Sequence, residues 1–277
     1  MKKTIVAAKW LRKNLKDPNL IILDASQTEN KSGLKTEFEG LQIPNARFFD
    51  LKNTFSKKDT DLPNMLLNSE DFEVEVRKLG INNASKIVVY DNLGIYTSPR
   101  VWWMFKIMGH DNIAVLNGGL PEWVNIGFET EMIQNKKYKV GDFKATFKPT
   151  MVKNIEDIKI NLKTEKGLLI DARSKGRFNG TAPDPRPTLK SGHIPNAVNL
   201  PYTEVLNNGK LKSKEELTQL FNKIQINDLP LIFSCGSGIT ACILNLAAEQ
   251  VVKNEKAVYD GSWTEWASTN SNPIESS

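Results

Sequence analysis

The stretch Leu231-Ile-Phe-Ser-Cys-Gly-Ser-Gly-Ile-Thr-Ala-Cys-Ile-Leu-Asn-Leu-Ala-Ala248 contains three local patterns that decide the fold. Residues 231–234 are mostly apolar and predict a buried strand, and residues 235–240 predict a tight loop with two glycines. Residues 241–250 are rich in strong helix formers and predict a helix. This order is typical of α/β proteins with parallel sheets. Cys235 is therefore expected at the carboxyl end of a strand, facing the start of a helix.

The position of Cys235 favours a reactive sulfur. Backbone N–H groups at a helix start have no partner within the helix, and the positive end of the helix dipole points to the same place. Gly236 and Gly238 allow the loop to turn its amides inward. Since these groups stabilise an anion, we predict that Cys235 is a nucleophile and not merely a small buried apolar residue.

Three kinds of chemistry use a cysteine in this position. A cysteine phosphatase needs an arginine six residues after the cysteine, where this chain has Ala241. A cysteine protease or amidase needs a positioned histidine as base, and the sequence contains only His110 and His193. A sulfur carrier that forms a persulfide needs only a ring of loop amides around the sulfur. The loop therefore favours sulfur transfer.

Composition places the chain among soluble globular proteins. Its 277 residues are 40% hydrophobic and 25% charged, which is enough for one large core or two smaller ones. The net charge of +5 is spread along the sequence without the dense basic stripe of a nucleic-acid binder, and no apolar run is long enough to span a membrane. Two cysteines argue against a disulfide framework. We therefore predict a cytoplasmic protein that binds neither nucleic acid nor membranes.

Four motifs recur in the same order about 145 residues later in the chain, which indicates an internal duplication. The pairs are Ile21–Asp24 with Leu168–Asp171, Ile43–Ala46 with Ile194–Ala197, Tyr90–Asp91 with Ser234–Cys235, and Asn117–Trp123 with Asp260–Trp266. The sequence thus predicts two α/β domains, residues 1–135 and 154–277, joined by a polar linker over residues 136–153. Asp91 stands at the cysteine position of the first copy and cannot carry sulfur, so the second copy is predicted to be catalytic.

Hydrophobic periodicity predicts further elements in the first copy. Helices are expected over residues 4–14, from Ser69 or Asp71 to Leu79, and over residues 100–108. Strands are expected over residues 20–24, 86–91 and 113–116. The polar tail over residues 269–277 is predicted to fray.

The loop Cys235-Gly-Ser-Gly-Ile-Thr-Ala241 resembles the active-site loop of the 3-mercaptopyruvate sulfurtransferases, a branch of the tandem rhodanese family. The thiosulfate branch carries Arg and Lys at the positions of Gly236 and Ser237. The resemblance spans nearly the whole chain. It implies an α/β fold of two tandem rhodanese-like domains, each a mostly parallel sheet with helices on both faces, and an inactive amino-terminal domain.

The resemblance also implies a reaction and a set of site residues. Cys235 would take the sulfane sulfur of 3-mercaptopyruvate, release pyruvate, and pass the sulfur to cyanide or to a thiol acceptor such as thioredoxin, without metal or organic cofactor. Asp171 is expected to support the site by orienting an arginine. The residues implied in substrate binding are Arg177, Arg186, Gly236, Ser237, Gly238, Ile239 and Thr240.

The residue types of the arginine loop fit this role. Arg177 and Arg186 lie in a proline-rich loop after the strand that ends at Asp171, and guanidinium groups bind carboxylates with parallel hydrogen bonds. The simpler alternative is that they pair with Asp171 and Asp184. At its family motif His193 is usually structural, and we expect Cys242 to be a buried helix residue rather than a redox partner.

One segment departs from the family. Related enzymes are proposed to activate the loop serine through a histidine and an acid, where this chain has Asn64 and Lys52. An amide does not act as a base, so either the reaction needs no such relay or the enzyme is weak, and we favour the first. Two other functions stay open: a thiosulfate sulfurtransferase, and a non-catalytic rhodanese that only delivers or senses sulfur.

Overall fold

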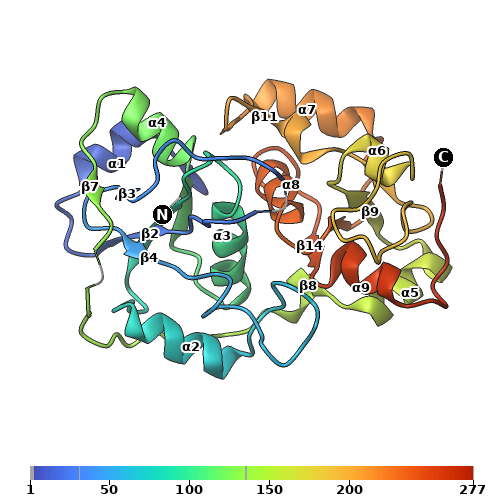
Figure 1. The fold of residues 1–277 in the computed structure, drawn as a ribbon, viewed down its shortest axis with the longest axis horizontal. Helices are drawn as coiled ribbons and strands as arrows, with labels where there is room; N and C mark the ends of the chain where they lie inside the picture. The colour runs from blue at the N-terminus through green and yellow to red at the C-terminus, as the bar shows by residue number, and fades with distance from the viewer. Residues whose placement is uncertain (1–2, 31, 135, 277) are drawn as a thin grey trace. The chain divides into compact units, whose positions relative to one another are not determined.

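The chain forms two compact units in a computed structural model that describes residues 3–30, 32–134 and 136–276 (Figure 1). The first unit comprises Met1–Ser56, Leu66–Lys148 and Asn208–Leu211, and the second comprises Lys57–Met65, Pro149–Asn207 and Lys212–Ser277. Each unit thus includes one short segment from the sequence of the other half. Within the described ranges, no helix has the length and apolar character that crossing a membrane requires.

The first unit is built on a sheet of five parallel strands in the order β1-β6-β5-β2-β4. The elements of this unit are β1 (Ile5–Val6), α1 (Ala8–Asn14), β2 (Leu20–Asp24), β3 (Leu41–Gln42), β4 (Arg47–Phe48), α2 (Ser69–Lys78), β5 (Lys86–Tyr90), α3 (Ser98–Ile107), β6 (Ile113–Leu116), α4 (Gly119–Asn125), β7 (Glu131–Met132) and β12 (Lys210–Leu211). Strands β3 and β7 form a separate antiparallel pair.

Helices cover both faces of this sheet because neighbouring strand residues point to opposite sides. On one face, Val88 and Tyr90 of β5 belong to a core that also contains residues of α1 and α4, including Leu11 and Trp123. On the other face α3 packs on β5 and β6. Phe105 of α3 contacts a cluster of phenylalanines that includes residues of α2 and of the loops: Phe49, Phe72 and Phe143.

The second unit repeats this architecture with a parallel sheet in the order β10-β9-β13-β14-β8. Its elements are η1 (Pro149–Met151), β8 (Val152–Lys153), α5 (Ile155–Thr164), β9 (Leu168–Asp171), α6 (Lys175–Phe178), β10 (Val198–Asn199), η2 (Tyr202–Val205), β11 (Leu206–Asn207), α7 (Lys214–Lys223), β13 (Leu231–Ser234), α8 (Ala241–Ala248), β14 (Lys256–Tyr259) and α9 (Ser262–Ser268). Residues of α5 and α9 share a core with β9, β13 and β14, and α8 packs on β13 and β14. The predicted fold class is confirmed.

The strand predictions that rest on continuous apolar runs are confirmed at their boundaries for β2, β6, β9 and β13. The predicted helix over residues 4–14 is wrong at its start, because Ile5 and Val6 pair with β6 as an edge strand and the helix begins at Ala8. The cap of α2 was also predicted wrongly. Asn68, and not Ser69 or Asp71, accepts a hydrogen bond from the backbone of the first turn.

The carboxyl-terminal tail is docked through residue 276, so the predicted fraying is wrong. Glu275 and His193 exchange backbone hydrogen bonds of 2.8 and 3.0 Å and form an antiparallel bridge. Asn272 is buried and donates to Trp266 O (3.1 Å), and the indole of Trp266 donates to Pro273 O (2.9 Å). The tail is held because its backbone groups and an amide find partners in the second unit.

Candidate active site

Cys235 is the first residue after β13, and helix α8 begins six residues later. β13 lies at the centre of its sheet, between β9 and β14. Loops at the carboxyl ends of parallel strands are the usual position of ligand sites in α/β sheets. Cys235 is 1% exposed, and its thiol is not in a disulfide.

Ser262 is a buried hydroxyl beside Cys235 that the sequence analysis did not identify. Its Oγ accepts a hydrogen bond from Cys235 N (3.2 Å), donates to Tyr259 O (2.8 Å) and lies 4.0 Å from Cys235 Sγ. The φ angle of Ser262 is 52°, a left-handed conformation that costs a non-glycine residue about 1–3 kcal/mol. The residue therefore occupies a strained position in which its hydroxyl reaches the cysteine.

The start of α9 holds the backbone of the cysteine loop. Trp263 N donates to Cys235 O (2.9 Å), and Thr264 N donates to Gly236 O (3.0 Å). The Thr264 hydroxyl donates to the same Gly236 carbonyl (2.6 Å). Because all four residues are buried, these bonds fix the direction in which the loop leaves β13.

The remaining loop residues lead into α8. Gly238 adopts φ +76°, a conformation that favours glycine, and its carbonyl oxygen lies 3.3 Å from the thiol sulfur of Cys242. Cys242 is fully buried, as expected for a helix residue that faces the core. Ile239 is buried, and Ser237 and Thr240 are half-buried.

The structure brings Arg177 and Arg186 together over the cysteine loop. A methyl group built on Gly236 would lie 3.1 Å from Arg177 Nη2 and 3.7 Å from Arg186 Nη1. Glycine at this position thus leaves room for both guanidinium groups. The Arg177 Nε atom is buried and has no hydrogen-bond partner among the described residues. A carboxylate arriving here would meet N–H groups of two arginines.

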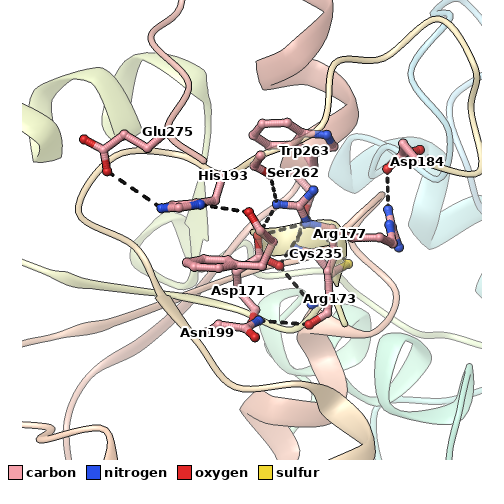
Figure 2. Close-up of polar contacts among 12 residues, drawn as sticks. Asp171, Arg173, Arg177, Asp184, His193, Asn199, Cys235, Ser262, Trp263 and Glu275 are labelled. Carbon is pink, nitrogen blue, oxygen red and sulfur yellow. Dashed lines mark hydrogen bonds and ion pairs between the residues drawn. The ribbon is translucent and has the colours of Figure 1, made fainter. Parts of the chain in front are cut away.

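Each of the two arginines is oriented by Asp184. Arg177 Nη2 lies 2.5 Å from Asp184 Oδ2 (Figure 2). Arg186 Nη1 lies 3.8 Å from Asp184 Oδ1. The Arg186 backbone also donates to Asp184 Oδ1 (2.9 Å). The two arginines therefore pair with an aspartate, as the simpler alternative predicted, and they also lie over the cysteine loop.

Asp171 orients an arginine, as expected, and this arginine is Arg173. It binds Arg173 through both carboxylate oxygens (2.6–3.1 Å), and both side chains are buried. The guanidinium group of Arg173 also donates to Gly192 O (2.8 Å) and stacks on the Trp263 ring at 4.2 Å. Breaking a buried pair of this kind costs about 3–5 kcal/mol. The pair therefore joins β9 to α9.

His193 contacts the segment that bears Arg177. Its Nδ1 lies 2.9 Å from Phe178 O, and the two rings stack at 3.8 Å. Its Nε2 lies 3.7 Å from a Glu275 carboxylate oxygen (Figure 2). Phe178 follows Arg177 directly in the sequence. The histidine thus links the docked tail to the segment that bears the first arginine.

Asn64 belongs to the second unit and contacts the cysteine loop. Its Nδ2 atom lies 3.2 Å from Ser237 O and 3.1 Å from Ser237 Oγ. A carbonyl oxygen only accepts hydrogen bonds, so the amide must present its NH₂ group to Ser237, and the serine hydroxyl accepts as well. Lys52, at the family's acid position, lies in the first unit and pairs with Glu29 (3.7 Å).

Comparison with known proteins identifies relatives over almost the whole chain. The family model for the rhodanese-like domain matches twice, at residues 7–126 and 154–269. The chain is 38% identical to the thiosulfate/3-mercaptopyruvate sulfurtransferase 1, mitochondrial, of Arabidopsis thaliana, with 98% of this chain and 78% of that protein covered. It is 39% identical to the 3-mercaptopyruvate sulfurtransferase of Mus musculus, with 95% and 92% covered.

Solved structures agree with this relationship. The crystal structure of a 3-mercaptopyruvate sulfotransferase from Escherichia coli superimposes with a TM-score of 0.82 at 34% identity, and covers 95% of this chain and 99% of that one. The two family matches fall on the two units with parallel five-stranded sheets. The chain therefore belongs to the rhodanese family and contains two rhodanese-like domains.

Proposed function

We propose that the chain is a 3-mercaptopyruvate sulfurtransferase in which Cys235 carries the sulfur. The Cys235 thiolate attacks the sulfur of 3-mercaptopyruvate, an S–S bond forms and the C–S bond breaks. The electron pair of the C–S bond passes to carbon, and the resulting pyruvate enolate takes a proton from water. A thiolate acceptor or cyanide then attacks the outer sulfur of the persulfide and releases the Cys235 thiolate.

The observation that carries this proposal is the meeting of a thiol and a pair of arginines at one loop. Arg177 and Arg186 lie over Gly236, the residue after Cys235. A donor whose carboxylate binds the arginines would have its sulfur close to the cysteine, which is the positioning that lowers a reaction barrier. The curated relatives are sulfurtransferases by name, which supports the same reaction.

We assign the chemistry to the second copy, residues 154–277, and an inactive role to the first, residues 1–135, with residues 136–153 as linker. In the first copy Asp91 follows β5 as Cys235 follows β13, and an aspartate does not form a persulfide. The segment with Asn64 is the exception, since it lies in the first half of the sequence and in the second unit of the fold.

The donor is proposed from the chemistry of the loop. Gly236 and Ser237 add no positive charge beside the cysteine, and thiosulfate, a dianion, gains more from such charge than a monoanionic keto acid does. Thiosulfate stays the main alternative, because the Arabidopsis relative is named for both donors. A thiol protein such as thioredoxin is the proposed acceptor, and a cytoplasmic location fits the two free cysteines.

Two measurements test the proposal. Intact-protein mass spectrometry after donor treatment should show one added sulfur atom on Cys235, which Cys235→Ser loses and Cys242→Ser retains. Steady-state kinetics should give a higher kcat/KM for 3-mercaptopyruvate than for thiosulfate. The added sulfur on Cys242, or a preference for thiosulfate, would contradict the corresponding part of the proposal. Persulfide formation and partner capture without turnover would favour the sulfur-delivery alternative.

A further inference from the structure

A buried carboxylate lies between the two arginines of the candidate site. The side chain of Asp184 is 2% exposed, whereas those of Arg177 and Arg186 are 21% and 20% exposed. Asp184 therefore faces both guanidinium groups from the protein side, and the arginines keep an open edge. Figure 2 shows the Asp184 carboxylate directed at Arg177.

This cluster of two arginines and one aspartate carries less positive charge than the two arginines alone would carry. Two guanidinium groups and one carboxylate leave a net charge of +1. The nearby Asp171–Arg173 pair is neutral and buried, and Lys175 is paired with Glu204 at 3.5 Å. Leaving aside the Cys235 thiolate, which either donor meets equally, a donor that reaches the loop above Gly236 thus meets two sets of N–H donors but only one uncompensated positive charge among these side chains.

We propose that Asp184 determines the charge of the donor that the site accepts. This inference rests on the proposed function. A net charge of +1 is neutralised by a monoanionic donor such as 3-mercaptopyruvate, whereas thiosulfate brings a second negative charge toward the Asp184 carboxylate. The arginines alone would attract either donor, and the more highly charged one more strongly. The buried acid beneath the arginines therefore adds to the selectivity that the uncharged Gly236 and Ser237 provide.

A charge effect and a purely structural effect of Asp184 predict different kinetics. Asp184 also positions Arg177 and the Arg186 backbone, so its loss weakens binding of any anionic donor. A purely structural role would lower kcat/KM for both donors by the same factor. A role in charge selection changes the ratio of the two values, whatever their absolute size.

The test compares Asp184→Asn with Glu204→Gln in the full-length protein. Both substitutions raise the net charge by one, but Glu204 is 39% exposed and pairs with a lysine that is more exposed still. In Asp184→Asn we expect the ratio of kcat/KM for thiosulfate to that for 3-mercaptopyruvate to rise about tenfold near pH 7 and low salt. In Glu204→Gln the ratio should stay at the wild-type value.

Unreactive anions give a second readout that does not depend on turnover. Inhibition by sulfate, a dianion, should strengthen in Asp184→Asn relative to inhibition by pyruvate, a monoanion. An unchanged ratio in both assays, with normal persulfide formation, would overturn the role of Asp184 and leave the proposed function intact. The same rise in Glu204→Gln would assign the effect to overall charge. A wild-type protein that takes sulfur from neither donor would instead overturn the proposed function.

Discussion

The loop after β5 in the first unit and the loop after β13 in the second follow equivalent central strands, but they begin with Asp91 and Cys235. In the first loop, the Asp91 carboxylate accepts hydrogen bonds from the amides of Tyr96, Thr97 and Ser98 (2.9–3.0 Å) and from the Ser98 hydroxyl (2.6 Å). The strand-loop-helix arrangement of this fold thus gathers N–H donors around an anion, and in the first unit the chain's own carboxylate occupies them.

Burial at this position disfavours the charged form of Asp91. Burial raises the pKa of the Asp91 carboxyl above its ordinary value, although the hydrogen bonds from Ser98 and the loop amides act in the opposite direction. A cysteine at the same place presents a single sulfur atom instead of two carboxylate oxygens. We infer that the first copy is closed to sulfur transfer because its anion site is already filled.

The turn that donates a hydrogen bond to each loop also differs between the two units. In both units the turn after the next strand donates a backbone N–H to the first loop residue, from Leu120 to Asp91 O (3.0 Å) and from Trp263 to Cys235 O (2.9 Å). The residue before this donor is Gly119 in the first unit and Ser262 in the second, with φ angles of 54° and 52°. The second unit therefore keeps a strained backbone with a side chain, and the side chain contacts the cysteine.

The largest expected effect comes from making the second loop resemble the first. We predict that Cys235→Asp abolishes transfer from both donors, because a carboxylate cannot form a persulfide. Asp91→Cys in that background should not restore turnover, since residues 25–42 of the first copy contain no arginine and three glutamates. Donor-dependent release of pyruvate and thiocyanate measures both variants. Turnover by the double variant would show that the first unit is a usable site.

The arginine pair is the second difference between the copies. Arg177→Ala and Arg186→Ala are each expected to weaken transition-state binding by about 1.5–3 kcal/mol, seen as a lower kcat/KM, because each removes hydrogen bonds to a charged group. Lys175→Ala, which removes an exposed basic residue of the same segment, is the control and should change kcat/KM little. Wild-type kinetics in both arginine variants would exclude donor binding by this loop.

Ser262 provides a smaller and more specific test. Ser262→Ala and Ser262→Gly both lose the hydrogen bond to the Cys235 amide, and we expect each to lower kcat/KM about tenfold. Only glycine relieves the left-handed backbone, so Ser262→Gly should be more stable than Ser262→Ala by about 1 kcal/mol in denaturant unfolding. Both variants lack the hydroxyl. If they differ in activity but not in stability, the Ser262 hydroxyl is therefore not what positions Cys235.

The smallest effect is expected at Asn64. Its amide orients Ser237 without supplying a base, so Asn64→Ala should cost about tenfold or less in kcat/KM. Asn64→His should add a titration near the ordinary histidine pKa of ~6.5 to the pH profile of kcat/KM. A thousandfold loss in Asn64→Ala, with persulfide formation on Cys235 intact, would show that this segment is central to proton transfer.

The sequence predicted the strands, the repeat and the cysteine loop well because these features depend on local patterns. An apolar run such as Leu231–Ser234 has no alternative to burial, and the loop glycines follow it directly. Two-residue edge strands such as β1 have no periodicity to detect. Ser262 was missed for a different reason: a serine in a glycine turn is common, and only the tertiary fold brings it to a cysteine 27 residues earlier.

The partners of the arginines also could not be predicted from the sequence alone. Its basic residues were identified as a possible carboxylate site, but which acid orients which arginine depends on side-chain directions that spacing does not determine. Asp171 orients an arginine as expected, but spacing alone did not indicate that this arginine is Arg173. The docked tail was missed because its main partners are backbone groups, such as the bridge between Glu275 and His193, and composition does not reveal these.

The exchange of short segments between the units limits where this chain can be divided. Lys57–Met65 lies in the first half of the gene and in the second unit of the fold, and Asn208–Leu211 lies in the opposite arrangement. A recombination event that cut the gene at the linker would leave each half without a piece of its own unit, and the second half without Asn64. We therefore expect each half, expressed alone, to be less stable than the same unit in the full chain.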